Sequence, residues 1–181
     1  LNKDEVFKNN LSSDIQEGTT LVHVRRGDYV DIGENLNVRF YEEAINLCKS
    51  KIDKFSFEVF TDDYKWVSEQ NIFKGAIAIH GPKSNIEELM SDITKMFNFQ
   101  NFIIGNSSFP LIPAIFSNSK NSLFIIADPW MKNQNIGDPG QVKIFMAQAH
   151  KNHQAPGHVK IIRPHAPTGT REGHRDQGPG T

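Results

Sequence analysis

The sequence predicts one α/β domain built on a doubly wound parallel sheet. Five short apolar runs alternate with helical patterns between residues 19 and 127. No hairpin turn signal joins two of these runs, so each strand is expected to reach the next through a crossover, as parallel strands do. A chain of 181 residues is long enough for one well-buried core and too short for two full domains.

The predicted strands are rich in β-branched and aromatic residues and are closed by polar or turn residues. The first ends in an Arg-Arg-Gly turn, the second at Asp62-Asp63 and the third at Gly81-Pro82. The five strands are expected at residues 19–25, 55–61, 76–80, 102–105 and 123–127.

Apolar residues at helical spacing predict the helices between the strands. The first helix covers residues 38–52, and a short one runs through Trp66 and Val67. Asn85 is expected to cap the next helix. Its apolar face is predicted to consist of Ile86, Leu89, Met90, Ile93, Met96 and Phe97.

The last predicted helix contains two prolines. If Ser107 or Ser108 caps it, Pro110 and Pro113 lie in its first turn or just beyond, where backbone N–H groups have no intrahelical partner. The prolines are therefore compatible with a helix here.

The two ends differ in composition from the domain at residues 19–136. Residues 1–18 predict a lead-in helix that stops at Gly18. Residues 137–181 hold 7 of the 13 glycines, 5 of the 9 prolines and 5 of the 7 histidines. We expect this segment to be a disordered tail or a foreign extension, with at most a transient helix at residues 142–149. Because the first residue is Leu1, we expect a fragment or a processed product.

Composition excludes several classes of protein. The formal net charge of -1 gives no general affinity for polyanions, so no nucleic-acid partner is expected. A single cysteine, Cys48, allows no disulfide framework, and no apolar run reaches the length of a transmembrane helix. P-loop, dinucleotide-binding and nucleophile-elbow patterns are also absent from the sequence.

Residues 23–29 read His-Val-Arg-Arg-Gly-Asp-Tyr and follow the first strand. Alternation along the strand places His23 and Arg25 on one face. The guanidinium of Arg25 is suited to bidentate binding of phosphate, and Gly27 is expected to allow a sharp turn that brings Asp28 back. A solvated strand end with an Arg–Asp pair remains the alternative.

Two further polar groups follow strands. Asn106, Ser107 and Ser108 stand where a strand passes into a helix, which favours either an anion site or ordinary helix capping. Asp62 and Asp63 suit hydrogen bonding to a base or sugar, or the acidic start of a helix. Because carboxyl ends of parallel strands meet at one edge, all three groups are expected there.

No metal site is predicted. Asp62 and Asp63 have no further ligand at a suitable spacing. The histidines of the tail lack a cysteine partner, and His80 at a strand end is interpreted as structural.

Together, these motifs resemble the α-1,2-fucosyltransferases of bacterial type, glycosyltransferase family 11. The resemblance covers residues 15–136 and is carried by residues 23–29, 60–63 and 106–109, and residues 128–130 also look like an element near the family's end.

The resemblance implies one Rossmann-like half of a GT-B glycosyltransferase. Such an enzyme transfers fucose from GDP-fucose to the 2-hydroxyl of a galactose in a glycan acceptor, with inversion and without a metal or other cofactor. It implies that Arg25 grips the β-phosphate, that His23 lies against the nucleotide and that Asp62 or Asp63 binds the guanine edge. The implied substrate-binding set also includes Arg26, Asn106, Ser107 and Ser108.

Arg25 and Asp28 are expected to be catalytic. The base that deprotonates the acceptor hydroxyl is left open among Asp28, Asp31, Glu34 and the missing half of the enzyme. The parent enzyme is expected in the cytoplasm or at the cytoplasmic membrane face if bacterial, and in the Golgi if eukaryotic.

The chain also departs from the family. Residues 110–114 replace the family's paired tryptophans, and the arginine motif begins at residue 23 although it lies about midway along a full member. The amino-terminal half is therefore expected to be missing. Two alternatives follow, a truncated and inactive nucleotide-binding module, or a GT-B transferase that uses another nucleotide sugar.

Overall fold

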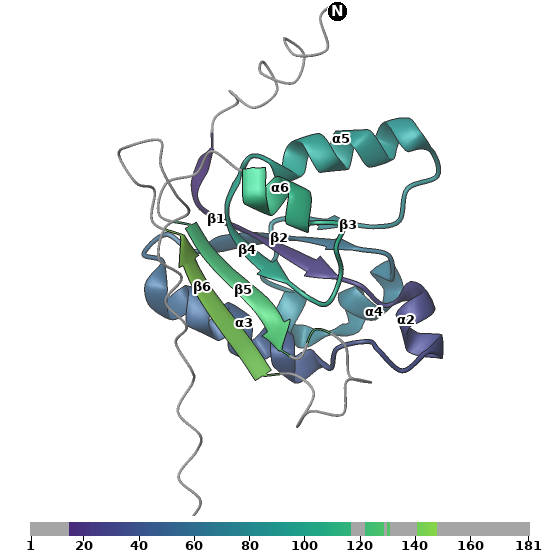
Figure 1. Ribbon diagram of the computed structural model, residues 1–181, viewed down its shortest axis with the longest axis horizontal. Helices are drawn as coiled ribbons and strands as arrows, with labels where there is room; N and C mark the ends of the chain where they lie inside the picture. Colours follow the sequence, from purple (N-terminus) through teal and green to yellow (C-terminus); the bar gives the residue numbers. More distant parts are fainter. Residues whose placement is uncertain (1–14, 117–121, 129, 131–140, 148–181) are drawn as a thin grey trace, which may run out of the picture.

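The computed structural model describes residues 15–116, 122–128, 130 and 141–147, which form a six-stranded sheet flanked by helices (Figure 1). The strands are β1 (Gln16–Val24), β2 (Ser56–Thr61), β3 (Ile79–His80), β4 (Phe99–Ile104), β5 (Ser122–Asp128) and β6 (Gln141–Ala147). The helices are α2 (Gly27–Asp31), α3 (Val38–Lys51), α4 (Tyr64–Glu69), the 3-10 turn η1 (Asn71–Phe73), α5 (Ile86–Met96) and α6 (Leu111–Phe116).

The strand order β3-β2-β1-β4-β5-β6 confirms the doubly wound class. The pairs that β1 to β5 form with one another are all parallel. The order reverses between β1 and β4, because the chain builds one side of the sheet through β2 and β3 and the other through β4 and β5. His23 stands beside Ile104 at this reversal. Open α/β sheets bind ligands in the crevice at such a switch point.

The core has two layers, one on each face of the sheet (Figure 1). One layer joins Val22 and Val24 of β1 to α3, α4 and η1, where Tyr41 and Phe73 are almost fully buried. The other joins Leu21 of β1 to residues of α5 and α6. The predicted alternation of faces along β1 is therefore confirmed, and it sends His23 to the same side as α6.

β1 is longer than predicted. Gln16 pairs with Phe99, so residues 16–18 belong to a strand and not to the end of a helix. Gly18 has a φ of 80° at a register shift between Gln16 and Thr20, and its N–H donates to Gln100 Oε1 at 2.8 Å. The glycine thus permits an irregularity inside the strand. Residues 1–14 of the predicted lead-in helix lie outside the described residues.

β6 contradicts the prediction of a transient helix at residues 142–149. Gln141–Ala147 pairs antiparallel with β5, from Asp128 opposite Gln141 to Ser122 opposite Ala147. The sequence Val142-Lys143-Ile144-Phe145-Met146 has the composition of a strand, and the open edge of β5 supplies backbone partners. The predicted tail therefore contains a strand of the sheet, and its residues 148–181 lie outside the described part.

β3 and α5 differ from prediction in extent and burial. β3 has two residues, but Ile77 N–H still donates to Phe57 O and Val59 N–H to Ala78 O, so the extended segment lies along β2. Asn85 caps α5 as predicted, accepting from Glu88 N–H at 2.9 Å. Only Met96 of α5 is fully buried, because α5 covers the sheet mainly with its last turn. No described helix is long and apolar enough to span a bilayer.

Candidate functional site

Arg25 follows β1 directly and lies between two carboxylates. Its Nη1 is 2.9 Å from Asp62 Oδ2 and its Nη2 is 2.6 Å from Asp28 Oδ1. Its guanidinium carbon lies 5.5 Å from the centroid of the Tyr29 ring. The side chain remains 36% exposed. The charge is thus held in a defined direction and stays accessible to an anion in solution.

Asp62 connects the Arg25 side chain to the backbone of Arg26. Its Oδ1 accepts from the Arg26 N–H at 2.7 Å, while its Oδ2 faces Arg25. A Cβ on Gly27 would lie only 2.6 Å from Asp62 Oδ2. Gly27 is the first residue of α2, so its absent side chain makes room for Asp62. The sharp turn expected at this glycine is replaced by a helix start.

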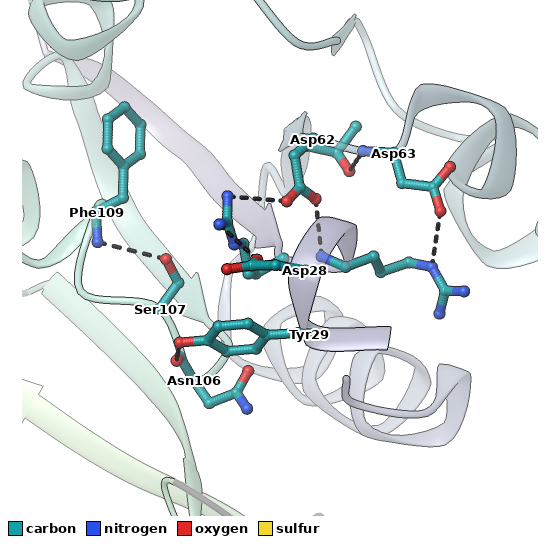
Figure 2. A network of polar contacts seen from close by, with 10 residues as sticks. Asp28, Tyr29, Asp62, Asp63, Asn106, Ser107 and Phe109 are labelled. Atoms are coloured by element: carbon teal, nitrogen blue, oxygen red, sulfur yellow. Dashed lines mark hydrogen bonds and ion pairs between the residues drawn. The ribbon is translucent and has the colours of Figure 1, made fainter. Parts of the chain in front are cut away.

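Arg26 points toward α4. Its Nε donates to Asp63 Oδ2 at 3.0 Å, and its guanidinium carbon lies 4.0 Å from the Trp66 ring centroid. Asp63 also accepts from Trp66 N–H at 3.0 Å and caps α4. Figure 2 shows Asp63 turned away from Asp28 and Ser107. Of the two roles predicted for Asp63, the structure therefore shows the acidic start of a helix.

These contacts also lower the pKa of Asp63. Partial burial would raise the pKa of the carboxyl, but hydrogen bonds from Trp66 N–H and from the Arg26 side chain outweigh that effect and hold it below its usual range. Asp63 is therefore a carboxylate that is already paired within the protein.

The β4–α6 loop supplies the other side of the switch point (Figure 2). Asn106 Nδ2 donates to Glu34 O at 2.6 Å, and Asn106 O accepts from Tyr29 Oη at 3.2 Å. Tyr29 therefore contacts both this loop and Arg25. The sequence pattern did not predict the hydrogen bonds of Tyr29 and Glu34 with this loop, although Tyr29 is the last residue of the arginine motif.

The serines differ from their predicted role as helix caps. Ser107 is buried, and its Oγ accepts from Phe109 N–H at 3.4 Å. Ser108 is exposed, and its carbonyl accepts from Leu111 N–H at 3.1 Å. α6 begins at Leu111, so Pro110 precedes it and Pro113 lies in its first turn. Both prolines therefore stand where a helix tolerates a residue without a backbone N–H group.

Three buried polar atoms at the switch point have no hydrogen-bond partner among the described residues, and one of them, Asp62 Oδ2, forms only its ion pair with Arg25. The other two are His23 Nδ1 and Asn106 Oδ1, in residues that are 6% and 1% exposed. Burial, and secondarily the positive charge of Arg25, lower the pKa of His23 to about 3. The ring is therefore neutral at physiological pH. Unpaired buried polar groups are costly, and a ligand in the crevice would give them partners.

The exposed guanidinium of Arg25 offers a positive charge to an anion at this site. The described residues contain no group of three His, Cys, Asp or Glu side chains that could hold a metal. His80 lies elsewhere, with its Nε2 2.6 Å from Glu58 Oε2, which also pairs with Lys95 at 2.8 Å. This cluster joins β2, β3 and α5, in agreement with the structural interpretation of His80. The histidines of residues 150–174 lie outside the described part.

Comparison with known proteins identifies the family of this chain. Residues 5–143 match the sequence model of Glycosyl transferase family 11. The chain is 31% identical over 123 residues to the alpha-1,2-colitosyltransferase of Escherichia coli. That alignment covers 64% of this chain and 42% of the relative, so the chain spans less than half the length of the curated relative it matches. No solved structure matches the chain.

Proposed function

The chain belongs to glycosyl transferase family 11, and from this membership we propose that it is the donor-binding part of a fucosyltransferase that uses GDP-fucose. The reaction would transfer fucose to the 2-hydroxyl of a galactose in a glycan, with inversion and without a metal. The parent enzyme would have a GT-B architecture and work in the cytoplasm or at the cytoplasmic membrane face of a bacterium. The likeness to a bacterial transferase supports the bacterial setting.

The observation that carries the proposal is the position of Arg25. It follows β1 at the switch point between β1 and β4, its charge acts on the neutral His23, and the hydroxyl of the Tyr29 ring beside it donates to Asn106 O. A fixed guanidinium with one-third of its surface exposed can bind phosphate oxygens bidentately. Charge develops on the leaving GDP as the glycosidic bond to fucose breaks, and a preorganised cation stabilises that charge.

The neighbours of Arg25 have complementary roles in this proposal. The unpaired polar atoms of His23 and Asn106 would form hydrogen bonds with the nucleotide and the diphosphate. Ser107 and Ser108 would add hydroxyl groups at the carboxyl end of β4. Asp62 holds Arg25 from the other side, which leaves its carboxylate less available to a guanine base than expected.

Asp28 is proposed to act after the donor binds. Its carboxylate is 66% exposed and pairs with Arg25 through one oxygen. A diphosphate that takes over Arg25 would release this carboxylate. The freed group is then suited to accept the proton of the acceptor hydroxyl.

A direct test is calorimetric titration of the chain with GDP, UDP and CMP. GDP is expected to bind best, and Arg25→Ala is expected to weaken it by about 10- to 100-fold, the loss of one charge-assisted contact. Arg39→Gln is the matched control, because it removes another arginine from an exposed ion pair with Glu43. Undiminished GDP binding in Arg25→Ala would refute the assignment of Arg25.

Transfer is tested separately by incubating the chain with GDP-fucose and a galactoside. Product formation would reject the alternative of an inactive binding module. GDP binding without transfer would favour that alternative, since the chain spans less than half of its relative. The name of that relative favours colitose as a second candidate sugar, and a donor competition distinguishes the two sugars.

A further inference from the structure

The Arg26 side chain is engaged on two sides, by the N-cap residue of α4 and by a tryptophan of that helix. Its Nε is bound to Asp63, and Trp66 covers the face of its guanidinium at 4.0 Å. The side chain is 14% exposed, against 36% for Arg25. A planar guanidinium that is stacked and paired in this way is held rigidly.

Trp66 itself is anchored in the core. It packs against the buried layer of α3 and α4, and its ring centroid lies 6.2 Å from that of Phe73, which is 1% exposed. Asp63 is held as well, because it caps α4 and its own N–H donates to Thr61 Oγ1 at 3.0 Å. The partners of the Arg26 side chain are therefore fixed by the fold.

The Arg26 backbone carries this constraint to the exposed arginine. Its N–H donates to Asp62 Oδ1 at 2.7 Å, and Asp62 Oδ2 pairs with Arg25 Nη1 at 2.9 Å. A shift of the Arg26 backbone would therefore move Asp62 and with it the direction of Arg25.

We propose that Arg26, Asp63 and Trp66 form a positioning unit that orients Arg25 and makes no contact with the donor. The inference rests on the proposed function only in naming the diphosphate as the anion that Arg25 receives. It assigns a role to Trp66, and it gives the two adjacent arginines different tasks. One binds the ligand and the other holds the loop.

The first experiment needs no ligand. Hydrogen exchange of the Arg26 backbone amide is followed by NMR in the wild type and in Trp66→Leu, Trp66→Phe and Asp63→Asn. The amide is expected to exchange about 10-fold faster in Trp66→Leu and Asp63→Asn, because its bond to Asp62 loosens. Trp66→Phe keeps an aromatic face and is expected to restore most of the protection.

Val67→Ala is the matched control, since Val67 is a fully buried residue of the same helix. It is expected to lower the urea midpoint but to leave Arg26 exchange close to wild type. Unchanged exchange in Trp66→Leu, or equal acceleration in Val67→Ala, would overturn the proposal.

The second experiment is a double-mutant cycle with GDP as the probe. Arg26→Gln and Trp66→Leu are each expected to weaken GDP binding by about 10-fold. The double variant is expected to bind GDP no more weakly than either single variant, because both substitutions remove the same constraint on Arg25. Loss of affinity in Arg26→Gln with normal affinity in Trp66→Leu would mean that Arg26 contacts the phosphate directly. If the wild type fails to bind GDP, the proposed function fails, and amide exchange alone decides the positioning role.

Discussion

Replacing Gly27 with alanine is expected to disturb the site through a single atom. The added Cβ would stand 2.6 Å from Asp62 Oδ2 and 3.3 Å from its Cγ. Contacts of a Cβ below 3.0 Å are essentially never seen, so the carboxylate must retreat by at least 0.4 Å. It cannot do so freely, because Arg25 holds one of its oxygens and the Arg26 N–H holds the other.

The cost follows from these two contacts. Losing the charge-assisted hydrogen bond from Arg26 N–H is worth about 1.5–3 kcal/mol. The ion pair with the partly exposed Arg25 adds no more than about 1 kcal/mol after solvent screening. Alanine returns about 0.4–1 kcal/mol by reducing the freedom of the unfolded chain. We therefore expect Gly27→Ala to lower the free energy of unfolding by about 2 kcal/mol.

Urea denaturation of four proteins provides the assay: wild type, Gly27→Ala, Asp62→Ala and the double variant. Once Asp62 is alanine, the clash is gone and Gly27→Ala is expected to cost less than about 0.5 kcal/mol. Gly75→Ala is the control, because its Cβ would meet Phe57 at an ordinary 3.7 Å. An equal cost of Gly27→Ala with and without the Asp62 carboxylate would refute the reasoning.

Three further predictions concern other groups. His23, with a pKa of about 3, is expected not to titrate between pH 5 and 8, and following its ring protons by NMR checks this. Burial raises the pKa of Glu58, but hydrogen bonds from Lys95 and His80 outweigh it and lower the pKa on balance. The carboxylate is therefore expected to contribute fully to stability above about pH 4.3, and this contribution is lost as the pH falls. The urea midpoint of Glu58→Gln is expected to change less between about pH 3 and 5 than that of the wild type. Phe102→Ala, beneath the stacked Phe124, should lower the free energy of unfolding by about 3–5 kcal/mol in the same urea assay.

The parallel core of the fold follows closely from sequence patterns. The runs at β1, β2, β4 and β5 are apolar because both faces of the sheet are covered, and Asn85 marks the start of α5 by its side chain. The edges were harder to predict. β6 depends on the open backbone of β5, and the extension of β1 depends on pairing with β4, which local composition does not report.

The candidate site was predictable in its location and less so in its contacts. Arg25, Asp62 and Asn106 do follow the strands that meet at the switch point. Whether an aspartate faces a ligand or a neighbouring arginine depends on its direction after the strand. Asp62 and Asp63 are adjacent in sequence but pair with different arginines.

The sequence by itself determined the class of the fold, the edge of the sheet that holds the polar residues and the family, because apolar periodicity and short motifs are local properties. Only the tertiary structure decided how the two adjacent arginines divide their tasks. Arg25 is paired with Asp28 and Asp62 and stays partly exposed, while Arg26 is stacked on Trp66 of α4. That difference depends on which elements pack on each side of β1, and such long-range packing is absent from the local pattern.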